Sequence, residues 1–206
     1  MDHVSSYGDL IRRLWPADMP SFREHLLRLE GKSRYDRFGM VVSDELVAHY
    51  AEKCFQLDAI TYGFFVDGTM RAAGELRSCE PGSLFTEGAV EAAFSVESDW
   101  RRRGIGTELM ARIVRAASNR RADTLCLYCQ AHNSAMLGLA KKFETELQFQ
   151  TDDVTGRLIA RTPSFLSLWD EFVDDSLGFA AAMLDFQKRM LLLPSSESNG
   201  KARQRH

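Results

Sequence analysis

The most informative segment of this sequence is Arg101-Arg102-Arg103-Gly104-Ile105-Gly106-Thr107. An apolar run, Ala89–Val96, precedes it, and a pattern typical of an amphipathic helix, Ile105–Asn119, follows it. The glycines let the main chain turn tightly and approach a ligand closely. The first N–H groups of a helix bind anions, because they lack internal partners and lie at the positive end of the helix dipole. The stretch therefore predicts a phosphate or pyrophosphate site, to which the arginines add charge and forked donors.

Two common phosphate-binding motifs do not fit this stretch. A P-loop would close on Gly-Lys-Ser or Gly-Lys-Thr. The dinucleotide fingerprint G-x-G-x-x-G needs a third glycine where this chain has Leu109. The order Arg-x-x-Gly-x-Gly, between a strand and a helix, instead resembles the loop that binds the pyrophosphate of acetyl-CoA in the GNAT family of N-acetyltransferases. Taken alone, the hexapeptide also fits an arginine-rich surface turn at the start of a helix.

Three further segments resemble the same family, in the same order along the chain. Asn133 follows the apolar strand Thr124–Gln130 and opens the run 133–143, which is similar to the family's second cofactor segment, a helix under the pantetheine arm. Glu91 precedes Arg101 by ten residues, where a subgroup resembling the bacterial protein-lysine acetyltransferases (Pat type) carries a catalytic glutamate. The Asp-Trp pair before Arg101 also resembles that subgroup, and residues 34–46 resemble the link between the family's first two helices. The resemblance covers roughly residues 8–161.

This resemblance implies an α/β (α+β) fold, with a mixed, mostly antiparallel central sheet of six to seven strands flanked by four helices. It implies acetyl-CoA as the co-substrate, an amine acceptor and no metal. The pantetheine arm is expected to pair with the end of the strand Ala89–Val96, and the pyrophosphate to lie on the glycine loop. The residues expected to bind the cofactor are Phe94, Val96, Arg101, Arg102, Arg103, Gly104, Ile105, Gly106, Thr107 and Asn133.

Glu91 is the expected catalytic base, because an acceptor amine must lose a proton when it attacks a thioester. Its strand is otherwise apolar, which would partly remove water from the carboxylate. The alternative is a structural glutamate that is paired with an arginine such as Arg71 or Arg77.

The acid that would protonate the leaving thiol stays unassigned. Many members of the resembled family use a tyrosine seven residues after the asparagine, where this chain has Ala140. Tyr128 and His132 are nearby alternatives, although a lone tyrosine or histidine is more often structural. A thiol with a pKa near ~8.5 can also leave without an enzyme acid.

Composition limits the class of protein. A chain of 206 residues with 45% hydrophobic residues suits one globular domain, or one domain with an appendage. A net charge of −3 gives no overall positive field, so we expect no nucleic-acid partner. No apolar run has the length of a membrane span, and Met1–Val4 does not open a signal peptide, so we expect no membrane partner and a cytoplasmic location.

The spacing of Cys126 and Cys129 is that of a redox or zinc pair, but both lie in the predicted strand Thr124–Gln130. Strand residues three apart point to opposite faces of a sheet, so these thiols would not chelate together. We expect them to be buried core cysteines in a reducing compartment.

The remaining pattern predicts the other elements. A helix is expected to start at Pro16 and end at Gly31, and a second one to be capped by Ser43. Asp67-Gly68 predicts a hairpin turn. The further expected strands are Asp9–Trp15, Ala59–Val66, Met70–Arg77, Glu146–Gln150 and Arg157–Arg161, with a helix at Ser134–Phe143.

Residues 162–193 form a C-terminal extension to the predicted catalytic domain of residues 1–161, and residues 194–206 read as a disordered tail. Large apolar residues recur every seven positions in the extension, which predicts one apolar stripe on a long helix or on two helices broken at Gly178. The stripe residues are Phe165, Phe172, Phe179, Phe186 and Leu193, joined by Trp169, Met183 and Met190. Such a stripe must cover the chain's own sheet and helices or a second copy, and we favour a homodimer.

Together these observations predict an N-acetyltransferase that moves the acetyl group of acetyl-CoA to a primary amine. The acceptor is a protein lysine, which the position of Glu91 favours, or a small-molecule amine. The alternative from another class is an acyl-CoA-binding sensor or interaction module that uses the C-terminal helix as its working surface. A redox or zinc function fails on the strand geometry of the two cysteines.

Overall fold

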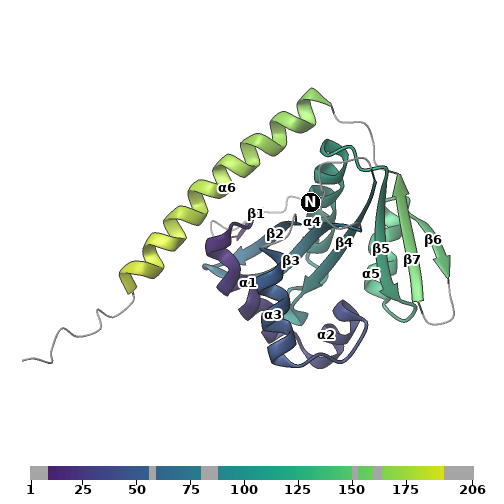
Figure 1. Cartoon of the computed structure of the whole chain (residues 1–206), viewed down its shortest axis with the longest axis horizontal. Helices are drawn as coiled ribbons and strands as arrows, with labels where there is room; N and C mark the ends of the chain where they lie inside the picture. The colour runs from purple at the N-terminus through teal and green to yellow at the C-terminus, as the bar shows by residue number, and fades with distance from the viewer. Residues whose placement is uncertain (1–8, 56–58, 80–87, 150–152, 160–163, 193–206) are drawn as a thin grey trace, which may run out of the picture.

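The computed structural model describes residues 9–55, 59–79, 88–149, 153–159 and 164–192. Seven strands form one sheet in the order β1-β2-β3-β4-β5-β7-β6 (Figure 1). The strands are β1 (Asp9–Arg13), β2 (Ala59–Val66), β3 (Thr69–Ser78), β4 (Ala89–Val96), β5 (Thr124–Gln130), β6 (Glu146–Phe149) and β7 (Asp153–Ile159). The helices are α1 (Met19–Arg28), α2 (Gly31–Phe38), α3 (Asp44–Cys54), α4 (Ile105–Asn119), α5 (Ser134–Lys142) and α6 (Phe165–Leu192), with short 3-10 helices at Pro16–Asp18 and Ser98–Trp100.

Helices cover both faces of the sheet (Figure 1). On one face, the predicted stripe of α4 is confirmed, since Leu109 and Ile113 are fully buried in the cluster that contains Leu76. On the other face, α1 and α3 bury Phe22 and Val47 in a second cluster. The sheet is therefore a two-sided core, as expected from strands that do not alternate cleanly between polar and apolar residues.

The one parallel pair in the described sheet, β4 with β5, positions the site. The two strands are paired only from Ala89 opposite Thr124 to Ala92 opposite Leu127. β4 continues to Val96 along β3, so its last residues have no partner on the β5 side. A helix crosses between the strands, which is why they had to be parallel. The sheet thus opens at the carboxyl ends of β4 and β5, the usual ligand position in open α/β sheets.

The prediction for the first helical segment was wrong in its boundaries. One helix was expected to run from Pro16 to Gly31, but α1 ends at Arg28. Leu29 adopts an extended conformation that stops the helix, and Gly31 begins α2 instead of ending α1. Because α2 was predicted only as a link, five helices lie on the sheet before α6, where four were expected.

The last hairpin forms, with a first arm that ends at Phe149 and a second arm that is longer than predicted and shifted toward the turn. β7 begins at Asp153, four residues before the predicted start at Arg157. Gln150 and Arg161 of the predicted arms, the first two residues of the extension and the tail 194–206 lie outside the described residues. None of the helices that the structure describes combines the length and the apolarity of a membrane span.

The C-terminal extension is one continuous helix, α6, that packs across the edge strand β1 (Figure 1). Gly178 does not break it. A Cβ atom at this position would lie 3.1 Å from Cβ of Arg12 and 3.7 Å from the backbone nitrogen of Arg13. Glycine is therefore needed here because helix and strand approach each other closely.

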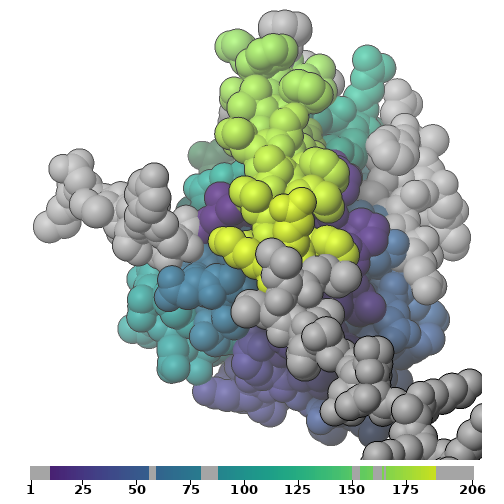
Figure 2. Space-filling model, turned by 90° about the vertical axis from the view of Figure 1, so that its left-hand side faces the viewer, coloured from purple at the N-terminus to yellow at the C-terminus, as the bar shows by residue number. Residues whose placement is uncertain are grey.

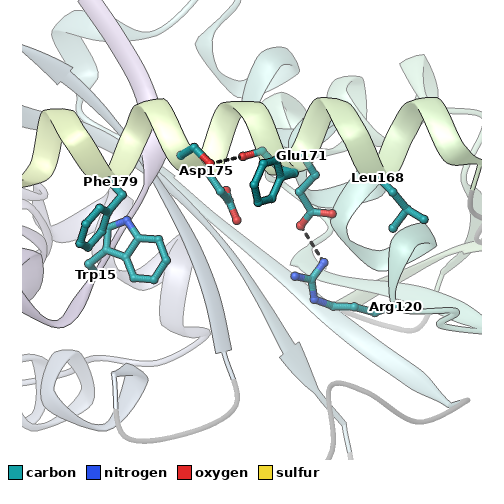
Figure 3. Close-up of a pocket in the computed structure, with 8 residues that line it drawn as sticks. Trp15, Arg120, Leu168, Glu171, Asp175 and Phe179 are labelled. Carbon is teal, nitrogen blue, oxygen red and sulfur yellow. Dashed lines mark hydrogen bonds and ion pairs between the residues drawn. The ribbon is translucent and has the colours of Figure 1, made fainter.

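Acidic side chains hold α6 on the core. Glu171 accepts a hydrogen bond from Arg120 at 2.7 Å, and the two side chains face each other in Figure 3. Asp174 is bound by Arg115, and Asp175 is bound by Arg13 at 2.6 Å. These contacts, with buried Ala182, form the docked side of the helix.

Of the two coverings that the stripe allowed, this chain or a second copy, this chain leaves much of the stripe uncovered. Phe179 does pack in cis, edge-on against Trp15 with ring centroids 5.3 Å apart (Figure 3). Phe172, however, is 65% exposed, and Trp169 and Phe186 are also exposed. The outward side of α6 runs across the face of the molecule in Figure 2. The carboxylates of α6 face the core because Arg13 on β1 and Arg115 on α4 bind them.

Candidate functional site

A cavity of about 660 Å³ lies where β4 and β5 separate. Its wall comes from four segments that are distant in sequence: the end of β4, the glycine loop with the start of α4, the first turns of α5, and α2. The predicted cofactor residues among its lining are Phe94, Val96, Arg101, Arg102, Gly104, Ile105, Gly106, Thr107 and Asn133. The structure therefore brings together nine of the ten residues that the sequence proposed.

The glycine loop has the local geometry of an anion site. Gly104 is the N-cap of α4 with φ of +84°, a conformation that residues with a Cβ atom rarely adopt. A Cβ at Gly106 would meet only Leu139, at 4.0 Å, so the glycine leaves open space toward the cavity. Gly104 has no side chain to cap the helix, so the first N–H groups of α4 are available to a ligand.

Arg101 links this loop to its surroundings. Its Nε donates to the carbonyl oxygen of Val96 at 3.2 Å, and its Nη2 donates to the hydroxyl of Ser33 on α2 at 2.7 Å. Arg103 is the predicted cofactor residue that does not line the cavity. Its guanidinium stacks over the Trp100 ring at 4.6 Å and donates to the carbonyl of Asp99. That arginine stiffens the turn, and its charge lies beside the cavity.

Asn133 caps the helix that follows β5. Its side-chain oxygen accepts a hydrogen bond from the backbone N–H of Met136 at 3.1 Å, which caps α5. The same residue lines the cavity, so capping and a cofactor contact are compatible.

Glu91 lies on β4 beside the point where β5 departs, outside the lining of the cavity described above. Its carboxylate accepts a hydrogen bond from Nη2 of Arg77 at 3.1 Å, which confirms the expected ion pair as a contact. The carboxylate is 31% exposed, so a substrate or water can reach it. The ion pair and a catalytic role are compatible, because a base that is held by one oxygen keeps the other free.

A buried polar network extends from Arg77 to the cavity wall. Arg77 donates to the Tyr50 hydroxyl at 2.9 Å, and Tyr50 donates to Glu75 at 2.5 Å. Glu75 also accepts from Arg37, which lines the cavity, at 2.5 Å. Burial alone would raise the pKa of Glu75, but the charges of Arg37 and Arg77 outweigh it and hold that pKa below its usual range. A continuous chain of hydrogen bonds thus joins Glu91 to the cavity.

A second polar array contains residues that the sequence reasoning missed. His25 on α1 is fully buried, with Nδ1 3.1 Å from Glu97 and Nε2 2.8 Å from the hydroxyl of Ser95 on β4. Glu97 is also bound by Arg28 and Arg71. Burial lowers the pKa of His25, and the hydrogen bond and charge of Glu97 offset only part of that effect.

The three positions considered for the acid that protonates the leaving thiol lie in different surroundings. Ala140 is buried in the core. Tyr128 is 57% exposed on β5, and its pKa is raised by burial and by Cys126. His132 is exposed and bonds with Nε2 to Asp36 at 2.8 Å, which joins the turn before α5 to α2.

Cys126 and Cys129 are buried, as predicted. Among the residues that the structure describes, no group of three or more histidine, cysteine, aspartate or glutamate side chains is arranged around a metal position. The donor set fits acetyl-CoA: a positive loop for the pyrophosphate, an unpaired strand end for an amide-bearing arm, and the partly exposed carboxylate of Glu91 earlier on the same strand.

The comparisons agree with this geometry. The model of the acetyltransferase (GNAT) family matches residues 21–144. The GNAT domain of PAT from S. lividans has a TM-score of 0.62 at 17% identity, over 72% of this chain and 89% of that chain. YncA, a putative acetyltransferase from Salmonella typhimurium with its cofactor acetyl-CoA, has a TM-score of 0.57 at 15% identity, over 77% and 99%. The ribosomal-protein-alanine N-acetyltransferase from Brucella melitensis has a TM-score of 0.57 at 19% identity, over 73% and 99%.

A search of curated protein sequences finds no match. The three solved structures named above are under 25% identical to this chain, so they show the fold and leave the subgroup open. The family model spans more than half of the chain and includes the glycine loop, Glu91 and Asn133. The chain therefore belongs to the GNAT family of acetyltransferases.

Proposed function

We propose that this protein transfers the acetyl group of acetyl-CoA to a primary amine, with residues 1–161 as the catalytic domain. The observation that carries the proposal is the cavity between β4 and β5, lined by both the glycine loop and the unpaired end of β4. The first N–H groups of α4 and Arg101 bind the pyrophosphate, and the strand end at Phe94–Val96 pairs with the pantetheine arm. This arrangement directs the thioester along β4 toward Glu91.

In this proposal Glu91 removes the proton from the acceptor amine, directly or through one water. Arg77 holds one carboxylate oxygen, which orients the group and leaves the other for the substrate. The test is Glu91→Gln, which keeps the size and the hydrogen bond to Arg77 and removes the base. Turnover should fall by ~10²–10⁴-fold, the usual effect of losing a general base. Acetyl-CoA affinity should stay nearly unchanged, because Glu91 lies outside the cofactor cavity.

The same variant separates an enzyme from an acyl-CoA sensor. A sensor would bind acetyl-CoA equally well with either residue and release no free thiol with any amine. A matched control is Glu45→Gln, an exposed glutamate on α3 that has no part in the site. Wild-type turnover in Glu91→Gln would reject the base and leave simple proximity as the mechanism.

For the acceptor we favour a protein lysine over a small amine. The ten-residue spacing between Glu91 and Arg101 and the Asp99-Trp100 pair support this choice. One structural relative is named for acetylating an alanine of a ribosomal protein, which supports a protein acceptor in general and not lysine in particular. The experiment compares a lysine peptide, the same peptide with blocked amines, and a polyamine, with thiol release as the readout. Faster turnover of the polyamine would move the proposal to small amines.

We also propose a homodimer through the outward side of α6. Exposed residues there repeat with spacings of four and three, the seam of a coiled coil. The seam consists of Leu166, Asp170, Val173, Leu177, Ala180 and Leu184. In an antiparallel pair centred on residue 175, Leu166 meets Leu184 and Val173 meets Leu177 of a second copy. An exposed apolar strip of this length is rare on a monomer.

Light scattering on the full chain tests this arrangement. Wild type should have twice the mass of one chain, and Leu177→Glu should shift it to one chain. Ser176→Ala, one residue away on the helix surface, is the control and should remain a dimer. A wild-type monomer at micromolar concentration would reject the dimer. We propose a reducing, cytoplasmic location, because Cys126 and Cys129 are buried as core residues.

A further inference from the structure

Two carboxylates, Glu75 and Glu91, lie close to one arginine, Arg77. Glu75 and Arg77 are two residues apart on β3, and Arg77 is the register partner of Glu91 on β4, so the three side chains share one face of the sheet. Arg77 forms an ion pair with Glu91 and none with Glu75. Glu75 is fully buried and Glu91 is partly exposed, so the less screened Glu75 competes strongly for the same guanidinium. Another group must therefore keep Arg77 at Glu91.

The hydroxyl of Tyr50 on α3 is placed to do this. It accepts a hydrogen bond from Nη1 of Arg77 at 2.9 Å and donates to Oε2 of Glu75 at 2.5 Å. Nη2 of the same guanidinium donates to Oε1 of Glu91 at 3.1 Å. Tyr50 therefore gives Glu75 a donor other than Arg77. It also fixes one end of the planar guanidinium while the other end binds Glu91.

Packing and protonation hold Tyr50 in this arrangement. Its ring lies edge-on to Phe38 with ring centroids 5.2 Å apart, and its hydroxyl also accepts from Nη2 of Arg37 at 2.5 Å. Burial and the negative charge of Glu75 raise the pKa of Tyr50, so the hydroxyl keeps its proton at physiological pH. The hydroxyl consequently donates to Glu75 and accepts from both arginines.

We propose that Tyr50 is a positioning residue for acetyl transfer, because it directs Arg77 to Glu91 and away from Glu75. This inference rests on the proposed function, in which Glu91 takes the proton of the acceptor amine. With Arg77 bound to Oε1, the Glu91 carboxylate keeps one orientation, and Oε2 is left for the amine or for a water. Tyr50 does not line the cofactor cavity, so it acts on the reaction only through Arg77.

Removal of the hydroxyl in Tyr50→Phe should release Arg77 from Glu91. Oε2 of Glu75 would keep only the thiol of Cys54, a weak donor at 3.4 Å. A buried carboxylate oxygen without a strong donor is costly, so Arg77 should turn toward Glu75. Glu91 then loses its anchor. Turnover should fall by ~10–100-fold, since misplacing a reacting group by about 1 Å can cost ~10²-fold.

The test is a double-mutant cycle in kcat on the full-length protein, with acetyl-CoA and the amine that wild type acetylates fastest. The variants are Tyr50→Phe, Arg77→Met and the combination of both. Each single variant should lower kcat by ~10–100-fold, and the double variant should be no slower than Arg77→Met, because Tyr50 acts through Arg77. Two independent contributions would multiply to ~10²–10⁴-fold, which would overturn the inference. Calorimetry should show unchanged acetyl-CoA affinity in all three, since neither residue lines the cavity.

The pH dependence of turnover is a second readout, which a merely structural role would not change. A guanidinium at hydrogen-bond distance favours the ionised form of a carboxylate, and a base must be ionised to accept a proton. The pH at which kcat/KM falls to half on its acid side should therefore be higher in Tyr50→Phe and in Arg77→Met than in wild type. The other ionisable groups that face Glu91 are the same in all these proteins: Cys79, Cys126 and Tyr128. An unchanged acid side in Tyr50→Phe would contradict the inference.

Tyr62→Phe is the matched control. Tyr62 is also a buried tyrosine, but its hydroxyl has no hydrogen-bond partner among the residues that the structure describes. This variant should keep the turnover and the pH profile of wild type. If circular dichroism shows that Tyr50→Phe does not fold, Arg77→Lys decides instead. An ammonium keeps the charge but cannot span Tyr50 and Glu91 as a fork, so turnover should fall as in Arg77→Met, and wild-type turnover would overturn the inference.

Failure of this inference and failure of the proposed function give different results. An inactive Glu91→Gln together with a fully active Tyr50→Phe would overturn the inference alone and leave Glu91 as the base. Wild-type turnover in Glu91→Gln would reject both the base and the residue that positions it. Absence of thiol release by wild type with every amine would reject acetyl transfer itself.

Discussion

Glu75→Gln is the substitution whose effect the structure constrains most closely. Glu75 is fully buried, and its two oxygens accept hydrogen bonds from Arg37 and Tyr50 at 2.5 Å each. The Arg37 side chain is only 5% exposed. Glutamine keeps the size and most of the hydrogen bonds, but it leaves the guanidinium without a counter-charge in the core.

Breaking a buried ion pair from one side costs about 3–5 kcal/mol, because the remaining charge is uncompensated. We therefore expect Glu75→Gln to lower the free energy of unfolding by about 3–5 kcal/mol, a large part of a typical total of about 5–15 kcal/mol. The assay is urea unfolding followed by circular dichroism at neutral pH. The double variant Arg37→Met with Glu75→Leu removes both charges and should recover most of the loss.

Two results would refute this reasoning. One is a loss below about 1 kcal/mol in Glu75→Gln, which would mean that water or Tyr50 already compensates Arg37. The other is a double variant that is no more stable than the single one, which would mean that shape, and not charge, decides the cost.

Three further outcomes follow from other parts of the molecule. Gly106→Val should leave the fold intact, since only Leu139 lies within 4.0 Å of a Cβ atom there. Calorimetry should nevertheless show acetyl-CoA affinity lowered by ~100-fold, or about 2.7 kcal/mol. Unchanged affinity would show that the pyrophosphate does not bind at this loop. Burial lowers the pKa of His25 below the unfolded value of about 6.5, so the unfolded chain binds more protons and stability should fall as pH drops below about 6.5, in spite of Glu97. His25→Gln should reduce that slope in urea melts near pH 7.5 and near pH 5.5, and an equal slope would assign it to other groups. Gly178→Leu should destabilise the protein by about 1–3 kcal/mol, because α6 must move off β1, whereas Gly68→Asn in an open turn should cost less in the same melts.

The glycine loop and its neighbours could be predicted from the sequence because their geometry is local. Gly104 and Asn133 act on residues within one helical turn, so spacing alone places them. The parallel pairing of β4 with β5 followed from the length of the connection between them. Local sequence patterns therefore predicted the position of the cavity, although they did not predict its volume.

The polar networks could not be predicted because their partners are distant in sequence. His25 and Ser95 are 70 residues apart, and Arg37 and Glu75 are 38 apart. One signal was present: Glu75 is a lone carboxylate in an apolar strand, as Glu91 is, and only the second was singled out. A charged residue in such a strand indicates a buried partner whether or not a family motif marks it.

The orientation of α6 shows a limit of hydrophobic periodicity. The pattern located the helix correctly, but it left open whether the apolar stripe covers this chain or a second copy, and it did not show that acidic residues would face the core. Arg13, Arg115 and Arg120 bind the acidic residues of α6, and the close approach at Gly178 leaves no room for large side chains. Hydrophobic periodicity identifies the residues that are unfavourable in water. It does not say whether the core of the same chain or a second copy covers them.

The position of α6 on β1 also affects how the sheet behaves in a crowded solution. β1 ends the described sheet, and a strand at such an end exposes backbone groups that can recruit a strand from another molecule. The helix α6 packs against this edge strand, so it hinders edge-to-edge pairing with another molecule. The opposite border, β6, has no such helix among the described residues, and it is only four residues long with exposed Glu146 at its start. The two edges of the sheet are thus protected from pairing with other molecules in different ways. The helix α6 covers β1, whereas β6 is short and carries an exposed charge.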